Sequence, residues 1–491
     1  MTTMHRIGVP LLSAALLLST AGTAGVAAPS IEQVARAAFN PVSIDANKTR
    51  IFMPLRNVKV RKHATKITSW QLEVTSDSPN MYVLERAVSA GVLHHLRIQT
   101  LEGKTYIHAD WRYAAPVDVN VRPGGLEVVF HHQKAEPHWR SIAEGVKFWE
   151  GQRWTASGPM RVRALRLDPR RVRLAPAIAS PGSEHMGLAT VSRLARAHGA
   201  IAAVNAGFFS PKTGQPQGML VMSHNMVSRT MLDRPGIWFD KDGAAQIRVE
   251  KPSASVRLDD GRQIRCQAVN EPPGHNRVVL YTAHHGRTTH TFADESRWEY
   301  AVAPDGRVVA EGHGNMGIPL GGWVVSGQGT GAGLLKRAMA FGKTVKIQFN
   351  LRPEVRDAMG GGPTLLEHGN VHVLARQQHF RPDVAYGRAP RTAVGLTEDG
   401  KYMLVCIDGH QPGYSVGATL TELAWTMKDL GATEALNLDG GGSSTLWMQG
   451  HTINRPSDGS ERPISTALLV VPREAQAQAT LERLLASEIK F

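Results

Sequence analysis

The chain has 491 residues, 42% of them hydrophobic, which is enough for two or three cores, and no biased stretch indicates an extended disordered region. Its two cysteines, Cys266 and Cys406, exclude a disulfide framework and lie at no zinc-ligand spacing. The formal net charge of +14 favours anionic partners. Because no nucleic-acid motif accompanies this charge, we expect an anionic envelope glycan or sugar phosphate and no nucleic acid.

The first 28 residues have the layout of a secretory signal peptide. His5 and Arg6 precede an apolar run over residues 7–18, and small residues lead to a cleavage site near Ala27 or Ala28. A retained membrane anchor is the weaker alternative, because polar residues and glycines interrupt the run. No later segment is apolar enough to span a bilayer after signal cleavage. We therefore expect a periplasmic or secreted protein.

Residues 29–133 are predicted to form a β-rich accessory module. Glycine-containing turns separate four alternating runs, at residues 67–74, 93–100, 105–113 and 126–132. The module carries no catalytic constellation, so the expected role is binding, as a contact to the cell wall or envelope. Residues 134–153 are interpreted as a linker.

Residues 154–472 are predicted to form the catalytic domain. Thr190 is a typical N-cap for a short helix that stops at Gly199, and a strand follows directly. Near the other end, Thr419 and Glu422 have the spacing of a capping box, and Gly431 closes that helix before a strand over 435–438. Residues 473–491 read as a C-terminal helix or tail. We predict an α+β fold, with a mixed β-sheet catalytic domain and flanking helices, preceded by a small all-β module.

The segment 435–444 carries the strongest chemical signal. A short apolar strand leads Asp439 into three glycines and two serines. Glycines let successive N–H groups converge on an anion and let a ligand approach the backbone. The alternative is a tight turn in which Asp439 only caps the loop.

A second acid stands at the end of a predicted hairpin. Residues 391–396 and 402–407 flank the turn Glu398–Asp399–Gly400. The second strand leads into Asp408, and Gly409 and His410 follow. Asp408 thus stands between an apolar strand and a glycine, as Asp439 does. Each acid alone could be a turn former at a strand end. Together they predict two carboxylates at one rim.

Six segments occur in an order that resembles the phosphodiester glycosidase family: residues 205–209, 360–365, 391–395, 407–409, 436–445 and 454–462. The resemblance spans roughly residues 155–472. It implies hydrolysis of a sugar joined through its anomeric carbon to a phosphodiester. Arginine commonly follows the Asp-Gly pair in this family, whereas this chain has His410, so the glycan and its phosphate contacts stay open.

The resemblance and the chemistry of such a bond suggest roles for the motif residues. Asp439 is predicted to stabilise or attack the oxocarbenium-like carbon. Asp408, with His410 as its substitute, is predicted to act as acid or base on a water. Arginines and backbone N–H groups would hold the phosphate. The predicted substrate-binding residues are Asn205, Gly361, Gly362, Arg391, Thr392, Gly440, Gly441, Gly442, Ser443, Ser444, Asn454 and Arg462.

The sequence therefore predicts an exported glycosidase that hydrolyses a sugar-1-phosphodiester or related glycosidic linkage in envelope or extracellular polysaccharide (an exopolysaccharide). No cofactor and no metal ligand set are predicted, although Asp408, Asp439 and Asn437 are oxygen donors of the kind that bind Ca²⁺. The alternative is a non-catalytic binding protein for an anionic cell-envelope glycan. A metallohydrolase that attacks phosphorus is a third hypothesis.

Overall fold

The computed structural model describes residues 41–473, apart from 46–47, 66–68, 78–81, 89–91, 112–114, 132–138, 156, 180–185 and 273. The predicted signal peptide and nearly all of the predicted C-terminal helix lie outside these residues. The chain divides into two compact units, the first made of residues 1–65, 70–110 and 116–132 and the second of the remainder. Within the described ranges, no helix combines the length and apolar character that a membrane crossing requires.

The first unit is a sandwich of two sheets, with strand orders β1-β2-β9-β8 and β3-β4-β7-β6-β5. Trp70 and Phe130 come from different sheets and pack edge to face, with ring centroids 5.2 Å apart. The four predicted runs are confirmed as strands β4, β6, β7 and β9. The strands are β1 Val42–Ile44, β2 Lys48–Met53, β3 Lys59–Thr65, β4 Ser69–Thr75, β5 Val83–Ala87, β6 Leu93–Leu101, β7 Lys104–Trp111, β8 Val117–Arg122 and β9 Gly125–His131.

An eight-stranded antiparallel sheet forms the centre of the second unit, in the order β10-β11-β12-β31-β30-β32-β28-β29. Residues 140–153, interpreted above as a linker, contribute β10 and most of β11 to this sheet. The strands are β10 Arg140–Ala143, β11 Val146–Thr155, β12 Gly158–Leu167, β28 Thr364–Glu367, β29 Asn370–Val371, β30 Arg391–Thr397, β31 Tyr402–Ile407 and β32 Ala432–Asn437.

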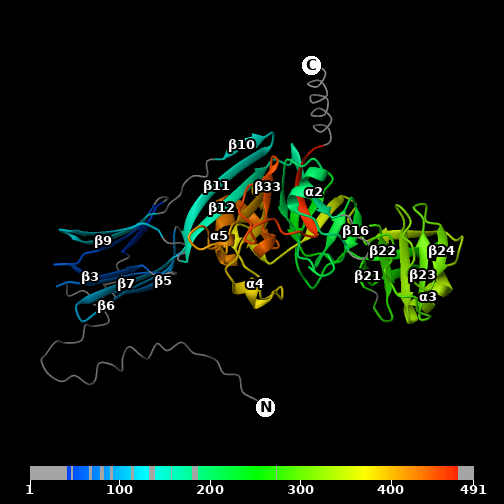
Figure 1. Ribbon diagram of the computed structural model, residues 1–491. Helices are drawn as coiled ribbons and strands as arrows, with labels where there is room; N and C mark the ends of the chain where they lie inside the picture. The colour runs from blue at the N-terminus through cyan, green and yellow to red at the C-terminus, as the bar shows by residue number, and fades with distance from the viewer. Residues whose placement is uncertain are drawn as a thin grey trace, which may run out of the picture. The chain divides into compact units, whose positions relative to one another are not determined.

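A second sheet, β13-β35-β14-β33-β34, packs on one face of the first. Leu404 of the first sheet and Leu468 of the second share one core, while α5 covers the opposite face of the first sheet and α2 packs on the outer side of the second. In Figure 1, β12 and α5 lie on one side of β33, and α2 lies on the other. The elements are β13 Val172–Ile178, α2 Val191–Ala197, β14 Ala202–Asn205, α5 Leu420–Asp429, β33 Leu446–Met448, β34 His451–Thr452 and β35 Thr466–Pro472.

The remaining strands belong to three smaller sheets, ordered β16-β15-β27-β17-β18, β20-β19-β26 and β21-β22-β25-β23-β24. They are β15 Leu220–Met222, β16 Asn225–Ser228, β17 Gly236–Asp240, β18 Ala245–Arg248, β19 Ala254–Leu258, β20 Gln263–Cys266, β21 Ala268–Val269, β22 Val278–Thr282, β23 Arg297–Val302, β24 Val308–Gly312, β25 Trp323–Gln328, β26 Val345–Phe349 and β27 Val355–Gly360. Two helices complete the second unit, α3 Thr330–Ala338 and α4 Pro382–Tyr386.

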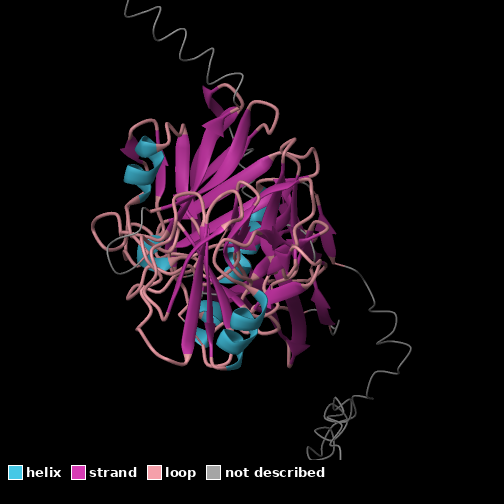
Figure 2. Cartoon of the chain, turned by 90° about the vertical axis from the view of Figure 1, so that its right-hand side faces the viewer, coloured by secondary structure: helices cyan, strands magenta, loops and turns pink. Residues whose placement is uncertain are grey.

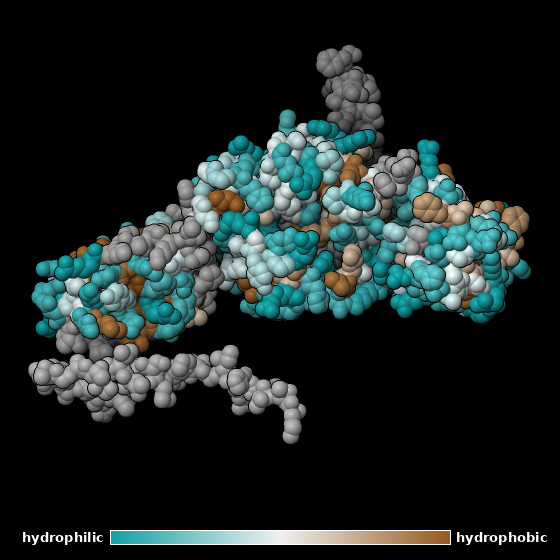
Figure 3. Space-filling view, turned by 60° about the horizontal axis from the view of Figure 1, so that its bottom comes forward, coloured by the Kyte–Doolittle hydropathy of each residue, from teal (hydrophilic) through white to brown (hydrophobic). Residues whose placement is uncertain are grey.

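The predicted α+β class is wrong, because the protein is mostly β. Strands make up 49% of the described residues and helices 9%, and strands dominate the view in Figure 2. The predicted helices at Thr190 and Thr419 do form, but they are short covers on sheets whose strands pair mainly antiparallel. The face shown in Figure 3 is mainly hydrophilic, with apolar residues scattered over it.

The capping box of α5 is confirmed in both directions. The Thr419 hydroxyl accepts a hydrogen bond from the Glu422 N–H at 3.2 Å, and the Glu422 carboxylate accepts one from the Thr419 N–H at 2.8 Å. The helix thereby begins at a fixed residue, and its buried face, including Leu423 and Met427, packs on the eight-stranded sheet.

We predict that Thr419→Ala lowers the free energy of opening of α5 by about 1 kcal/mol, because it removes one half of the capping box. Hydrogen exchange of the α5 amides measures this quantity. Thr421→Ala is the matched control. Thr421 is exposed, lies two residues after Thr419 in the first turn of α5 and makes no capping contact. Equal effects of the two substitutions would contradict the prediction.

Candidate active site

Strand register brings the predicted acids to one edge of the eight-stranded sheet. Arg391 at the start of β30 pairs with Ile407 at the end of β31, and Ala393 pairs with Asn437 at the end of β32. Asp408 and Asp439, which follow these two strand ends, therefore leave the sheet on the same side. The backbone at the two predicted acids therefore lies at the same end of neighbouring strands.

Asp439 is the acid that keeps contact with solvent, since its side chain is only partly buried. Its Oδ1 accepts a hydrogen bond from the Gly440 N–H at 3.0 Å. The surrounding protein excludes water and raises the pKa of Asp439 to about 6, although hydrogen bonds from Ser443 and Gly440 and the charge of Arg462 act in the opposite direction. A carboxyl with this pKa can change protonation near neutral pH.

Asn205 fixes the backbone at Asp439. Its amide Nδ2 donates to the Asp439 carbonyl at 2.7 Å, and its Oδ1 accepts from the Thr392 hydroxyl at 2.7 Å and from the Thr445 N–H at 3.1 Å. Asn205 and Thr392 are both completely buried. These two residues, predicted to bind substrate, therefore hold the backbone of Asp439 in place. The contact also joins the end of β14, which carries Asn205, to the segment that follows β32.

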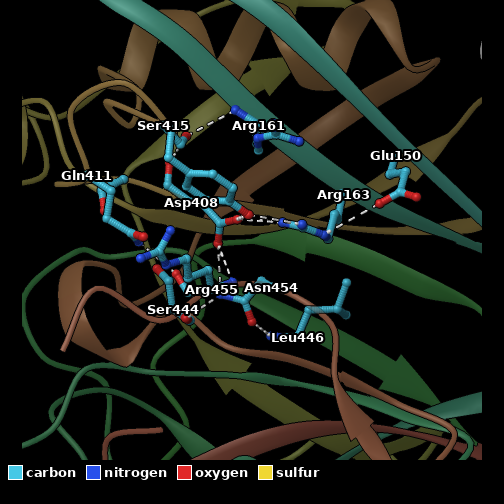
Figure 4. Close-up of polar contacts among 12 residues, drawn as sticks. Glu150, Arg161, Arg163, Asp408, Gln411, Ser415, Ser444, Leu446, Asn454 and Arg455 are labelled. Atoms are coloured by element: carbon cyan, nitrogen blue, oxygen red, sulfur yellow. Dashed lines mark hydrogen bonds and ion pairs between the residues drawn. The ribbon is translucent and has the colours of Figure 1, made fainter. Parts of the chain in front are cut away.

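Asp408 is completely buried and accepts hydrogen bonds on both oxygens. Oδ2 receives Arg163 Nη1 at 2.5 Å and the Tyr414 hydroxyl at 3.1 Å, while Oδ1 receives Asn454 Nδ2 at 3.1 Å and the Arg455 N–H at 3.0 Å. Figure 4 shows this carboxylate at the centre of the network. No face of Asp408 is left for a water or a sugar, so its geometry does not fit the predicted acid or base role.

Burial alone would lower the pKa of Arg163, but the Asp408 carboxylate and the Tyr414 hydroxyl together raise it above its usual range. The Arg163 guanidinium therefore stays charged in the folded protein. Asn454, predicted to bind substrate, takes part in the same network, because its Nδ2 also donates to the Ser444 carbonyl at 3.0 Å.

The glycine loop after Asp439 is a 3-10 turn over Gly441–Ser443 whose N–H groups are largely engaged inside the protein. The Gly441 N–H donates to the Pro390 carbonyl at 2.9 Å, and the Ser443 and Ser444 N–H groups donate to the Gly440 and Gly441 carbonyls. These contacts do not fit the predicted cradle of N–H groups around an anion. The loop instead allows close packing.

Space around the three glycines differs. A methyl group on Gly440 would lie 2.8 Å from the Pro390 carbonyl oxygen, and one on Gly442 would lie 2.0 Å from Arg462 Nη2. A methyl group on Gly441 would meet no atom within 4 Å, and its φ is +61°. The open side of the loop is therefore at Gly441, while Gly440 and Gly442 are glycine because neighbouring groups press against them.

The second glycine run packs beneath the end of β32. The Gly362 N–H donates to the Asn437 carbonyl at 2.7 Å, and Asn437 Nδ2 donates back to the Gly362 carbonyl at 2.8 Å. A methyl group on Gly361 would lie 2.8 Å from the same Asn437 carbonyl. Gly361 and Gly362 thus support the strand that carries Asp439.

The predicted phosphate-binding arginines already have partners. The guanidinium of Arg391 is buried and donates to the carbonyls of Ala418, Val384 and Gly387. Burial lowers the pKa of Arg391 to about 10, with Glu422 opposing this shift. Arg462 forms an exposed ion pair with Asp458 at 2.7 Å.

Three further predicted residues complete the site. The His410 side chain is exposed, its backbone is left-handed with φ 58°, and Nε2 lies 3.3 Å from the Arg388 carbonyl. Ser443 and Ser444 are both buried, and the Ser444 hydroxyl has no hydrogen-bond partner among the described residues. Of the two residues predicted to act as acid or base, His410 is exposed to solvent and Asp408 is not.

Calcium does not fit the three oxygen donors named from the sequence. A cation at Asp408 would have to displace Arg163. The Asn437 Nδ2 donates to the carbonyls of Gly362 and Leu438, while its Oδ1 has no hydrogen-bond partner among the described residues. Across the described ranges, no group of three or more histidine, cysteine, aspartate or glutamate side chains has a metal-binding arrangement.

Four residues of this site are not among the residues predicted from the sequence: Arg161, Arg163, Tyr414 and Arg455. Arg163 carries a signal, because it stands between Val162 and Ala164 and a buried charge requires a counterion. The signal is weak, because β12 also carries Arg161 and Arg166. Arg455 lies inside the motif 454–462. The sequence carries no signal for Tyr414.

We predict that Asp408→Asn destabilises the second unit by roughly 3–5 kcal/mol, because it leaves the buried Arg163 without its counter-charge. Denaturant unfolding measures the loss. Glu150→Gln is the matched control: Glu150 lies 3.8 Å from the same guanidinium but its side chain is 61% exposed, so the cost should stay within about 0.5 kcal/mol. Similar costs for both variants would show that burial does not govern this ion pair.

Sequence comparison finds one family model, described as phosphodiester glycosidase, that matches residues 296–471. The segment includes Asp408, Asp439, Arg455 and Arg462. An uncharacterised SPbeta prophage-derived protein of Bacillus subtilis, YomE, is 36% identical over 81 residues, which cover 16% of this chain and 12% of that protein.

The chain is similar in fold to solved bacterial structures, two of which follow, and it matches a third solved structure more weakly. A hypothetical protein from Synechocystis has a TM-score of 0.58 at 23% identity, covering 86% of this chain and 82% of its own. A protein of Burkholderia pseudomallei described as exported has a TM-score of 0.54 at 23% identity, covering 85% and 97%. The catalytic domain of zebrafish N-acetylglucosamine-1-phosphodiester alpha-N-acetylglucosaminidase has a TM-score of 0.41 at 18% identity, covering 68% and 86%. The match over residues 296–471 confirms the resemblance to the phosphodiester glycosidase family; it contains five of the six ordered motifs, and the motif at residues 205–209 lies outside it.

Proposed function

We propose that this protein is a glycosidase that hydrolyses a sugar-1-phosphodiester, or a related glycosidic linkage, in an envelope or extracellular polysaccharide. The observation that carries the proposal is Asp439, a partly buried residue at the start of the glycine loop, whose carboxyl accepts a hydrogen bond from the Gly440 N–H and has its pKa raised by burial to about 6. The family match over residues 296–471 supports the same reaction class. A periplasmic or secreted location belongs to this proposal.

Asp439 would act on the anomeric carbon in its ionised form. Departure of the phosphate leaves positive charge on the sugar ring, and a carboxylate at that carbon stabilises the charge or forms a covalent bond to it. A phosphate leaving group needs little protonation, so one solvent-exposed base for the attacking water is sufficient. His410 is the candidate for that base, because Asp408 is enclosed.

The groups around Asp439 would fix the orientation of its carboxylate. Asn205 holds its carbonyl, and the Gly440 N–H holds one carboxylate oxygen. Preorganised contacts of this kind cost no rearrangement during the reaction. The site needs no metal in this mechanism, and activity that survives a chelator would support that part of the proposal.

A non-catalytic binding protein for an anionic envelope glycan is the second candidate. The net charge of +14 favours it, because a basic surface attracts phosphate-bearing polymers whether or not a bond is cleaved. The two candidates differ in whether free sugar is released from a sugar-1-phosphodiester.

We predict that Asp439→Asn lowers turnover of a synthetic sugar-1-phosphodiester by at least about 10²-fold while ligand affinity is retained. Release of reducing sugar and binding calorimetry provide the two measurements. Asp429→Asn is the control, since Asp429 ends α5 on the surface and bonds to Arg153. If the native protein binds the ligand but releases no sugar, the binding protein is the correct alternative.

Oxygen-18 water distinguishes attack at carbon from attack at phosphorus. Label in the released sugar is expected from the proposed glycosidase. Label in the phosphate would contradict it and support a phosphodiesterase.

We predict that turnover rises as the pH increases through about 6, because the ionised form of Asp439 is the active one. Stability should change in the opposite sense. A folded-state pKa raised above the unfolded value means that the folded state holds the proton more tightly, so this group makes folding less favourable as the pH rises from about 4 to 6.

A pH–rate profile of the native protein tests the first statement, and the Asp439→Asn variant tests the second. It should be more stable than the native protein at pH 8 and should show no such gain below pH 4, in denaturant unfolding at each pH. An advantage of equal size at both pH values would contradict the raised pKa.

A further inference from the structure

A negatively charged substrate needs cations that the protein has not already neutralised. Near the candidate site, Arg391 is surrounded by carbonyls, Arg462 pairs with Asp458, and Arg388 pairs with Glu422 at 2.6 Å. Arg163 is held by Asp408. The arginines predicted to meet the phosphate are therefore poor candidates for it.

Two other arginines contact one aromatic ring at this site. The guanidinium carbon of Arg161 lies 4.6 Å from the centroid of the Tyr414 ring, and that of Arg455 lies 5.0 Å from it. Arg161 is partly buried and Arg455 is exposed. Among the residues that the structure describes, neither guanidinium forms an ion pair with a carboxylate.

The network around Asp408 attaches this group to the loop of Asp439. The Tyr414 hydroxyl and the Arg455 N–H both donate to the Asp408 carboxylate. Asn454, which precedes Arg455, donates to the Ser444 carbonyl at 3.0 Å at the end of the glycine loop. Figure 4 shows Arg161, Arg455 and Ser444 gathered around Asp408.

Charge and geometry at Tyr414 suit a phosphate. Two guanidinium groups, those of Arg161 and Arg455, lie over the Tyr414 ring, and a third, that of Arg163, lies between the buried carboxylate of Asp408 and the exposed carboxylate of Glu150. Three positive charges against two negative ones leave the local field positive. Stacking on an aromatic ring fixes a guanidinium plane and leaves N–H groups at its edge free to donate. Phosphate oxygens accept such hydrogen bonds strongly.

We propose that Arg161 and Arg455, stacked on Tyr414, form the subsite that binds the phosphate group of a glycosyl phosphodiester. The inference rests on the proposed function, because it assigns the leaving group of that reaction to a named part of the site. It separates two tasks: Asp439 acts on the sugar carbon, and the arginines at Tyr414 select substrates that carry phosphate.

The test compares two substrates that share a sugar, a sugar-1-phosphodiester and a neutral aryl glycoside. For Arg455→Ala and for Arg161→Ala, KM for the phosphodiester should rise roughly 10- to 100-fold, while kcat and the hydrolysis of the neutral glycoside stay unchanged. Arg166→Ala is the matched control, because Arg166 lies on the same strand β12 but pairs with Asp399. Changes of equal size on both substrates, or none on either, would overturn the subsite.

Two tyrosine variants separate the ring from the hydroxyl. Tyr414→Phe keeps the stacking surface and should retain most of the phosphodiester affinity, whereas Tyr414→Leu should lose it to an extent similar to Arg455→Ala. Circular dichroism and unfolding verify that each variant is folded. Retained affinity in folded Tyr414→Leu would contradict the role of stacking.

A failure of the proposed function would give a different result. If the native protein cleaves neither substrate, calorimetry with sugar-1-phosphate still tests the subsite: the native protein should bind this ligand at least about 10-fold more tightly than Arg455→Ala. Equal binding by the two proteins, or no binding by the native one, would overturn the inference independently of catalysis.

Discussion

The buried carboxylate of Asp408 is the interaction on which the candidate site depends. It joins three parts of the chain: β12 through Arg163, the segment after β31 through Tyr414, and the segment after β34 through Asn454 and Arg455. A charge without solvent is tolerated only when its partners are all in place. The three segments therefore reach their native positions together, and the glycine loop is held through Asn454 as a result.

Asp408 and Asp439 show how one local sequence pattern serves two purposes. Both acids follow a buried strand and precede glycine, yet one is enclosed by donors and the other remains accessible with a raised pKa. The enclosed acid contributes to the stability of the surroundings. The accessible acid makes folding less favourable when it is ionised, which is common where a group is kept reactive.

Local features of the sequence were sufficient to predict the capping box at Thr419, the hairpin 391–407 and the strands of the first unit, because each depends on residues close together in the chain. The fold class was not predictable in the same way, since the assembly of hairpins into sheets depends on pairs between distant segments, such as β12 with β31 and β13 with β35. The role of Asp408 depends on Arg163, 245 residues away. Likewise, no local pattern shows that carbonyls of Ala418 and Gly387 surround Arg391.

The pairing of β11 with β12 determines where a shortened version of the second unit can begin. The two strands pair along their whole length, from Val146 opposite Leu167 to Thr155 opposite Gly158. A fragment that starts at residue 154, the boundary expected from the sequence, would lack β10 and nearly all of β11. The hydrogen-bonding groups on that side of β12 would become an open edge, which invites strand addition from another molecule and aggregation. Recombinant fragments of this protein therefore need the residues from Trp139 onward in order to keep β12 paired along its whole length.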